Sequence, residues 1–209
     1  MNLREMANIE ALVLDIGNVI YPERWNLVLE KIKELNNSIT LEQFLDAYSK
    51  EWEKYRVDKI GSDEYWKNVA KELGFEESAG KELSGAFTDI WHDSNENLCN
   101  FLRNLNGKLK IYALSNSCPE NEARIKEDII NGKLRFINRF YLSHKEQVAK
   151  PDEAAYRNVL DTNNLDAEKC IYVDDKERNL IPARKIGMHA ILYKNFGCFK
   201  EQFERIVAL

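Results

Sequence analysis

The sequence predicts an α/β fold, in which a parallel β-sheet is covered by helices on both faces and a helical bundle is inserted after the first strand. Two observations support this prediction. Short apolar runs that stop at polar residues recur at 11–15, 110–117, 170–175 and 189–193, with helical patterns between them. The segment between the first two runs, 16–109, shows only helical periodicity. The core of the fold is therefore interrupted in sequence by the bundle.

The composition is that of a globular protein with an acidic surface. The chain has 209 residues, 44% of them hydrophobic, which is enough for one sizeable domain or a domain with a smaller insert. The net charge of −5 and the pI near 5.4 argue against nucleic acids and anionic membranes as partners, because these require clustered Lys and Arg. A small charged substrate stays open, since local charge can oppose net charge.

The cysteines and the apolar segments indicate a location. Four cysteines lie far apart in the sequence, without the spacing of a zinc site or a disulfide framework: Cys99, Cys118, Cys170 and Cys198. No stretch approaches the ~18 apolar residues that a membrane helix needs, and the first residues show no signal-peptide pattern. We therefore expect a cytoplasmic protein with reduced thiols. The sequence does not predict an oligomeric state.

Three of the predicted strands run into polar residues at their ends. Asp15 ends "ALVLD", Ser115 lies near the end of "KIYALSNS", and Asp174 and Asp175 end "CIYVDD". The carboxyl ends of parallel strands meet at one edge of a sheet, and ligands bind beyond that edge. The sequence therefore predicts a Rossmann-like sheet with these four side chains gathered at its carboxyl edge.

The remaining core elements follow from helix signals. The helix before the second strand is expected to be capped by Ser94 and to end at Gly107. The strand at 189–193, "HAILY", follows a predicted helix in which Pro182 suits the first turn and Gly187 the end.

The inserted bundle is predicted to span 21–91 as a cap, which leaves 1–20 and 92–209 as a discontinuous core. Thr40 and Gln43 can form a capping box at the start of one of its helices. Apolar and aromatic residues recur at spacings of three and four in two of its segments: Leu41, Phe44, Leu45, Tyr48, Trp52 and Tyr55, then Tyr65, Trp66, Val69 and Leu73. We expect these aromatic faces to form the core of the bundle rather than a platform for a ligand.

Asp15, Asp174 and Asp175 would bring three carboxylates into one crevice. Two like charges about 4 Å apart repel by roughly 4 kcal/mol at an effective dielectric constant near 20. A hard divalent cation removes this repulsion, and oxygen ligands with room for water and phosphate suit magnesium. An adjacent "DD" pair is common on protein surfaces, but after a buried-type strand it is a stronger sign of a metal site.

Two further groups could contact an anion at the same edge. Ser115, with the main-chain amide of Asn116, could hold a phosphoryl oxygen, although by itself a serine that only turns the chain is the commoner case. Lys150 precedes Pro151, which keeps the lysine out of the helix that follows. This lysine could neutralise an anionic oxygen and the aspartate, or it could lie solvated in a loop.

The order and context of these residues resemble the haloacid dehalogenase superfamily of hydrolases. "VLDIGNVIY" looks like its first motif, "IYALSNS" its second, "AKPDEAAY" its third and "CIYVDDKERNL" its fourth, so the resemblance covers essentially the whole chain. The insert length and the "GNV" form are similar to the subgroup with a helical cap between the first and second motifs. That subgroup includes sugar-phosphate phosphatases, flavin mononucleotide phosphatases and the phosphatase domain of epoxide hydrolases.

The resemblance implies a magnesium-dependent phosphomonoesterase that acts on a small phosphorylated metabolite, with sugar phosphates as one candidate. Asp15 would attack phosphorus to give an aspartyl phosphate, which water then cleaves. Magnesium would be held by Asp15, the carbonyl of Gly17 and Asp174, with Asp175 as a direct or water-mediated helper. These roles are carried over from the family's motifs position by position.

The same resemblance assigns the neighbouring polar residues. Ser115 and Lys150 would stabilise charge on the transferring phosphoryl group, which is the dominant contribution in this chemistry. Asn18 and Asn116 would contact the substrate. Asn179 matches a family position that supports the loop after the fourth motif.

Gly17 departs from the family pattern. Family phosphatases usually carry a second aspartate two residues after the nucleophile, which protonates the leaving oxygen and activates the incoming water. A glycine carbonyl can still bind metal, but no side chain is present to transfer a proton, and general acid–base catalysis contributes about 10²–10⁴-fold. Tyr21, Glu23 and His92 are candidates for the missing group. For Glu23, beside Pro22, a charge at a helix start is the simpler interpretation.

Two other functions stay open at this point. A dehalogenase-type carbon–halogen hydrolase also uses an aspartate nucleophile and needs no general acid, but it leaves the paired Asp174 and Asp175 unexplained. A binding or regulatory relative that has lost turnover at Gly17 would bind magnesium and phosphate analogues without forming a phosphoenzyme. Phosphate release that depends on Asp15 and on magnesium distinguishes the first function from both alternatives.

Overall fold

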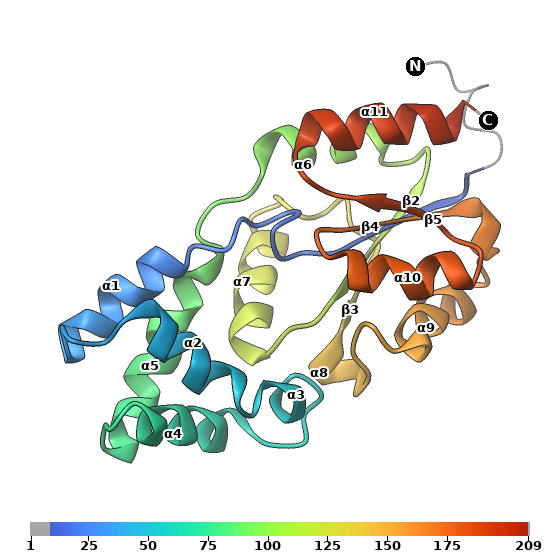
Figure 1. The fold of residues 1–209 in the computed structure, drawn as a ribbon. Coiled ribbons are helices and arrows are strands. Elements are labelled where there is room, and N and C mark those ends of the chain that lie inside the picture. Colours follow the sequence, from blue (N-terminus) through green and yellow to red (C-terminus); the bar gives the residue numbers. More distant parts are fainter. Residues whose placement is uncertain (1–8, 209) are drawn as a thin grey trace.

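A five-stranded parallel sheet forms the centre of the protein in a computed structural model that describes residues 9–208 (Figure 1). The strands lie in the order β3–β2–β1–β4–β5. Their bounds are Ala11–Leu14 for β1, Lys110–Ser115 for β2, Arg139–Leu142 for β3, Cys170–Asp174 for β4 and His189–Leu192 for β5. Because β1 lies between β2 and β4, the carboxyl ends of these three strands are neighbours. The first eight residues of the predicted core segment 1–20, and Leu209, lie outside the described residues.

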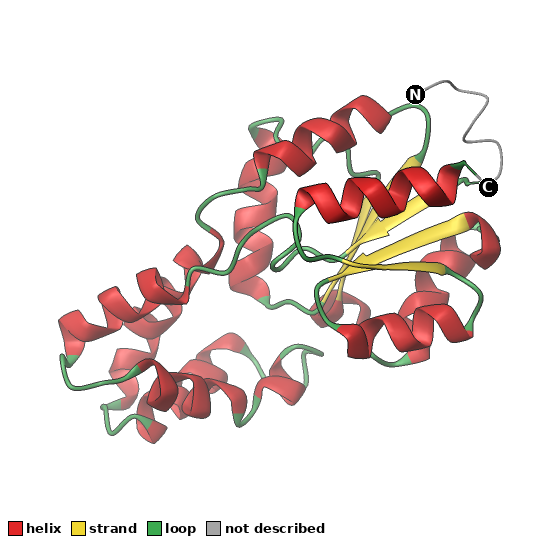
Figure 2. Cartoon of the chain, turned by 45° about the horizontal axis from the view of Figure 1, so that its top comes forward, coloured by secondary structure: helices red, strands yellow, loops and turns green. Residues whose placement is uncertain are grey.

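Both faces of the sheet are buried, which explains why its strands are continuous apolar runs. Leu12 and Leu14 on β1 belong to one hydrophobic cluster, and Ala11 and Val13 belong to another, as the twofold alternation of a strand requires. The first cluster includes residues of α6 (Glu96–Leu105), α7 (Pro119–Ile130) and α11 (Phe196–Val207). The second includes residues of α9 (Glu153–Asn163) and α10 (Glu177–Lys185). Figure 2 shows the strands between these helices, which confirms the predicted fold class.

The helices between β1 and α6 form a lobe beside the sheet (Figures 1 and 2). They are α1 (Trp25–Leu35), α2 (Leu41–Ser49), α3 (Trp52–Tyr55), α4 (Ser62–Glu72) and α5 (Gly80–Phe87), with short 3-10 turns at Glu77–Ala79 and Thr88–Trp91. The predicted capping box is confirmed, since Thr40 and Gln43 each bond the other's main-chain N–H. Most of the aromatic faces are bundle core, as expected. Tyr48 and Trp52 are only partly buried.

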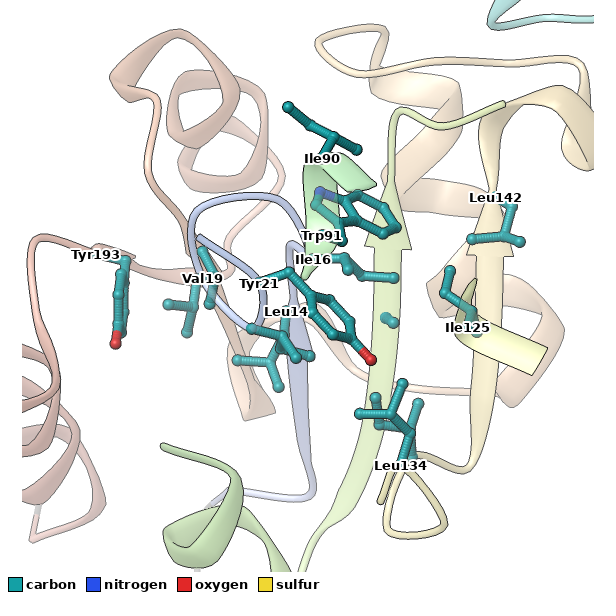
Figure 3. Close-up of a cluster of buried hydrophobic side chains, with 14 of the residues drawn as sticks. Leu14, Ile16, Val19, Tyr21, Ile90, Trp91, Ile125, Leu134, Leu142 and Tyr193 are labelled. Atoms are coloured by element: carbon teal, nitrogen blue, oxygen red, sulfur yellow. The ribbon is translucent and has the colours of Figure 1, made fainter. Parts of the chain in front are cut away.

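Two linkers, 15–24 and 88–95, join the lobe to the core, and they contact each other through Tyr21 and Trp91. Their rings stack with centroids 5.4 Å apart and planes 11° apart, and Figure 3 shows them side by side. The hydroxyl of Tyr21 donates to Asp128 Oδ2 on α7 at 2.5 Å. Each linker is therefore anchored to the other and to the core.

Three details differ from the sequence-based expectations. Strand β3 was not predicted, because only its last two residues, Tyr141 and Leu142, are buried and it begins on the exposed Arg139. Pro182 lies inside α10 and not in its first turn, because the helix already covers the sheet from Glu177 onward. The N-cap of α6 is Asn95, whose Oδ1 accepts from Leu98 N at 3.3 Å, and not Ser94.

Two short segments complete the chain. They are α8 (Ser143–Glu146), after β3, and the 3-10 turn Ala167–Lys169, before β4. Within residues 9–208, none of the helices has the length and apolar composition to cross a membrane.

Candidate active site

Three carboxylates meet where β1 and β4 end, as the order of the strands predicts. Asp15, Asp174 and Asp175 each offer one oxygen, and these oxygens all lie within 4.8 Å of one another. The main chain holds the two strand ends together, because Asp15 N donates to Val173 O at 2.8 Å. Asp15 and Asp174 are buried, and Asp175 is partly buried. The sheet thus brings three carboxyl groups together at its carboxyl edge.

Lys150 lies between two of these carboxylates. Its Nζ is 2.8 Å from Asp15 Oδ1 and 2.8 Å from Asp174 Oδ2, and only 1% of its side chain is exposed. The alternative of a solvated loop lysine is therefore wrong. A buried cation at this distance from both aspartates offsets part of their mutual repulsion, which would otherwise disfavour a folded site.

The pKa values of Asp15 and Asp174, the two aspartates that contact Lys150, are shifted in opposite directions. Burial raises the pKa of Asp15 to about 7, against the opposing effect of the Lys150 charge. Burial would also raise the pKa of Asp174, but Lys150 and the hydroxyl of Tyr172 hold it below the ordinary value. Asn179 adds two bonds from Nδ2, at 2.9 and 3.0 Å to the two oxygens of Asp174. These contacts favour the carboxylate form of Asp174, whereas burial disfavours the carboxylate form of Asp15.

Asp175 carries an incomplete set of hydrogen bonds. Its Oδ2 accepts from Asn18 Nδ2 at 3.2 Å, whereas its Oδ1 is buried and has no hydrogen-bond partner among the described residues. Burial raises the pKa of this carboxyl. A buried carboxylate oxygen without a donor is costly unless a ligand completes it.

The arrangement fits a hard divalent cation. Carboxylate oxygens of Asp15, Asp174 and Asp175 converge, and the free Oδ1 of Asp175 is one open position. The main-chain carbonyl of Gly17 accepts no hydrogen bond within the described part of the chain, so it too is available. An all-oxygen set of this kind suits Mg²⁺. Because any residue supplies a carbonyl, glycine at position 17 does not weaken the set.

Asn18 and Asn116, the two residues predicted to contact the substrate, form hydrogen bonds within the site itself. Asn116 Oδ1 accepts from Lys150 N at 2.9 Å, and Asn116 Nδ2 donates to Lys150 O at 2.8 Å. These two bonds fix the main chain that carries the lysine. Asn18 links Asp175 to the main-chain N–H of Glu23, which donates to Asn18 Oδ1 at 3.1 Å. Substrate binding by these two residues stays a prediction.

Ser115 lies at the end of β2 and is 1% exposed. Among residues 9–208 its hydroxyl makes only one long hydrogen bond, 3.5 Å to Asn116 O. The cavity over the carboxylate cluster is lined by the adjacent Asn116, not by Ser115 itself. Its role in binding a phosphoryl oxygen stays a prediction.

A cavity lies between the helical lobe and the carboxyl edge of the sheet, and residues of both parts line it. Its core side includes Asp15, Gly17, Asn116 and Lys150. The other lining residues are aromatic or charged for the most part: Glu23, Trp25, Tyr48, Trp52, Arg56, Phe87, Ile90, Trp91, Asn121, Lys176, Arg178 and Asn179. Tyr48 and Trp52, which were expected to form bundle core, pack against that core and also line this cavity.

Two residues that sequence reasoning missed connect the lobe to the core. Arg56, buried on α3's C-terminal side, donates from Nη1 to Lys150 O at 3.2 Å. Glu120 on α7 accepts hydrogen bonds from Tyr55, Ser62 and other lobe residues. Neither residue lies in a motif, and only buried charge at a lobe–core contact distinguishes them.

The three candidates for the missing proton-transfer group lie in different surroundings. Tyr21 is fully buried, and both its burial and its bond to Asp128 raise its phenol pKa far above the ordinary value. His92 is exposed and does not line the cavity. Glu23 lines the same cavity as Asp15. The simpler interpretation of Glu23 as a helix-start charge is incomplete, because its main-chain N–H and its carboxylate are both bonded within the site.

Comparisons with known proteins point to one family of hydrolases. A family model described as haloacid dehalogenase-like hydrolase matches residues 9–187. The sesquiterpene phosphatase astK of Aspergillus oryzae is 25% identical over 185 residues, which cover 86% of this chain and 87% of the fungal protein. These matches span both the sheet and the helical lobe.

Solved structures share the fold. The HAD family enzyme BT-2542 of Bacteroides thetaiotaomicron gives a TM-score of 0.79 at 18% identity, over 94% of this chain and 98% of that chain. Its complex with magnesium and inorganic phosphate gives a TM-score of 0.74 at 21% identity, over 89% and 94%. The L-2-haloacid dehalogenase of Xanthobacter autotrophicus, with chloropropionic acid covalently bound, gives 0.66 at 14% identity, over 92% and 81%. At these identities the likeness shows a common fold and leaves the substrate open.

Proposed function

The chain belongs to the haloacid dehalogenase-like hydrolase family, and we propose that it is a magnesium-dependent phosphomonoesterase acting on a small phosphorylated metabolite through an aspartyl phosphate. The observation that carries the proposal is the buried Lys150 between Asp15 and Asp174, beside an Asp175 oxygen that lacks a donor. A relative named as a phosphatase and a structural neighbour bound to magnesium and phosphate support the same reaction.

Asp15, Asp174, Asp175 and the Gly17 carbonyl would hold Mg²⁺, which supplies positive charge against the phosphoryl oxygens and the nucleophile. The chain's own residues do the rest. Lys150 lies 2.8 Å from Asp15 Oδ1 and favours the carboxylate form of a group that burial disfavours. In this proposal an oxygen of Asp15 forms a bond to phosphorus while the bond from phosphorus to the leaving oxygen breaks.

Ser115 and Lys150 would stabilise the negative charge that the transferring phosphoryl group carries. Asn116 acts on Lys150 indirectly, since it bonds the main-chain N–H and C=O of that residue at 2.9 and 2.8 Å. Asn179 and Tyr172 hold Asp174 in place by donating to its oxygens. In the second half of the reaction, water attacks the aspartyl phosphate, the Asp15–phosphorus bond breaks, and inorganic phosphate leaves.

We also propose that 21–91 acts as a cap that closes over the substrate, with 9–20 and 92–208 as the described part of the core. Arg56 and the cavity's aromatic wall, which includes Trp25, Tyr48 and Trp52, would contact the part of the substrate that is not phosphate. Such a wall suits an apolar or ring-shaped body. Sugar phosphates and prenyl monophosphates are therefore both substrate candidates.

A cytoplasmic location without nucleic-acid or membrane partners belongs to the same proposal. The four cysteines are free thiols, which suits a reducing compartment. The net charge of −5 opposes non-specific attraction to polyanions.

The test is phosphate release from a panel that includes aryl, acyl, sugar and prenyl phosphates, with Mg²⁺ and with EDTA. We expect Mg²⁺-dependent release by the wild type, loss of release in Asp15→Asn, and wild-type release in Asp161→Asn, which changes an exposed carboxylate on α9. Chloride release from a 2-haloacid that is unaffected by EDTA would contradict the proposal in favour of a dehalogenase. Binding of phosphate analogues without release from any substrate would favour a regulatory protein.

A further inference from the structure

The space beside Gly17 is occupied by the carboxylate of Glu23. A Cβ atom placed on Gly17 would lie 3.0 Å from Glu23 Oε1. It would also lie 3.8 Å from Trp91 Nε1. A contact of 3.0 Å is shorter than ordinary van der Waals separation, so a side chain at position 17 would require the Glu23 carboxylate to move by a few tenths of an ångström. The carboxylate absent from position 17 is thus replaced in space by one from position 23.

The surroundings of Glu23 hold this carboxylate in place. Its main-chain N–H donates to Asn18 Oδ1 at 3.1 Å, and Trp25 Nε1 donates to its Oε2 at 3.1 Å. Asn18 adopts a left-handed conformation, with φ of 56°, and its amide also bonds Asp175. One short loop therefore ties Glu23 to the carboxylate cluster.

The other oxygen of Glu23 is left free. Its Oε1 accepts no hydrogen bond, and Glu23 forms no ion pair with a Lys, Arg or His, among residues 9–208. Glu23 is partly buried and lines the cavity that also contains Asp15 and Lys150. A solvated helix-start charge would not be expected to have one oxygen fixed by a tryptophan and the other directed to the space beside Gly17.

We propose that Glu23 is the proton-transfer residue of this enzyme, in place of the aspartate that Gly17 lacks; this rests on the proposed phosphatase function. As Asp15 bonds to phosphorus, the protonated carboxyl of Glu23 gives its proton to the leaving oxygen, which departs as an alcohol. The resulting carboxylate then takes a proton from the water whose oxygen attacks the aspartyl phosphate. Inorganic phosphate leaves, and Asp15 and Glu23 return to their starting forms.

Substrates with different leaving groups test this role. Protonation matters for an alkoxide and little for a nitrophenolate, so Glu23→Gln should lower kcat/KM for alkyl phosphates by about 10²–10³-fold and for nitrophenyl phosphate by less than about tenfold. With nitrophenyl phosphate, kcat should still fall and a burst should appear, because the aspartyl phosphate accumulates when its hydrolysis lacks a base. Glu30→Gln, which changes an exposed carboxylate on α1, should behave as wild type.

A double-variant cycle gives a second readout that does not depend on Glu23→Gln folding well. Gly17→Asp alone should lower activity, since its Cβ would lie 3.0 Å from Glu23 Oε1 and displace that carboxylate from its present position. Gly17→Asp combined with Glu23→Ala removes that conflict and should recover at least tenfold in kcat/KM for alkyl phosphates over Glu23→Ala alone.

Each outcome decides between the two proposals. Wild-type activity of Glu23→Gln on alkyl phosphates, or an equal loss on both leaving groups, would overturn the role of Glu23 while leaving the phosphatase intact. A double variant no better than Glu23→Ala would also overturn it. Activity that does not depend on Asp15 would instead reject the phosphatase function itself.

Discussion

We predict that Glu120 stabilises the contact between the helical lobe and the core through its hydrogen bonds. Its Oε1 accepts hydrogen bonds from Ser62 Oγ at 2.6 Å, Trp66 Nε1 at 2.7 Å and Ser84 Oγ at 3.0 Å, and its Oε2 accepts one from the Tyr55 hydroxyl at 2.5 Å. All four donors belong to the lobe, whereas Glu120 belongs to α7 of the core. Replacing this one residue should therefore loosen the whole contact.

The size of the effect follows from which donors would remain buried. Tyr55 and Trp66 are each 1% exposed, so Glu120→Ala leaves two buried donors unpaired at about 1–3 kcal/mol each, or about 2–6 kcal/mol in the free energy of unfolding. Ser62 and Ser84 are only partly buried and can bond water instead. Glu120→Gln keeps an acceptor but loses the charge, and should cost about 1–2 kcal/mol.

Equilibrium urea unfolding followed by tryptophan fluorescence measures these differences, because Trp66 itself lies at the contact. Glu127→Gln, an exposed carboxylate on the same helix, is the matched control and should stay within about 0.5 kcal/mol of wild type. If Glu120→Ala were within 1 kcal/mol of wild type at neutral pH, the reasoning from buried donors would be refuted.

The same contact predicts a pH dependence. Burial would raise the pKa of Glu120, but the hydrogen bonds from Ser62 and Tyr55 hold it below its ordinary value of 4.5. A carboxyl with a lowered folded-state pKa contributes stability above its unfolded pKa and loses that contribution on acidification. The stability difference between wild type and Glu120→Gln should therefore be constant at neutral pH and shrink as the pH falls below 4.5. A difference that grows on acidification would contradict this sign.

Further predictions concern the carboxylate cluster. Lys150→Met leaves Asp15 and Asp174 buried without their cation, and urea unfolding should show a loss of about 3–5 kcal/mol together with loss of phosphate release; unchanged stability would count against the ion pair. Asp175→Asn should raise the Mg²⁺ concentration needed for half-maximal activity at least tenfold, unless Asp175 takes no part in metal binding. Asn116→Ala frees the main chain of Lys150 and should lower kcat about tenfold with little change in KM, whereas a change in KM alone would indicate substrate contact.

The fold and the centre of the site could be predicted because they depend on local patterns. Apolar runs that stop at Asp15 and Asp174 identify parallel strands, and the carboxyl ends of such strands must meet. Strand β3 escaped this reasoning because a four-residue edge strand with an exposed start has no clear apolar run. The burial of Lys150 also could not be predicted, since a lysine before a proline has the same local sequence whether it is solvated or paired.

The contacts between lobe and core could not be predicted for a different reason. Glu120 meets Tyr55 across 65 positions of sequence, and Glu23 reaches the space beside Gly17 only because of the path of the linker. Such contacts depend on how the two parts pack, and no periodicity within either part encodes that orientation. The proposal for the group that replaces the missing aspartate at Gly17 therefore depends on packing and not on a motif.

The most direct test of the account is mass spectrometry of the peptide containing Asp15 after acid quench during turnover of nitrophenyl phosphate with Mg²⁺. We expect a phosphorylated Asp15 that is absent in Asp15→Asn and in EDTA, and more of it in Glu23→Gln than in wild type, because hydrolysis of the intermediate is slowed. Phosphate release by Asp15→Asn at the wild-type rate, without any phosphorylated peptide, would contradict the account.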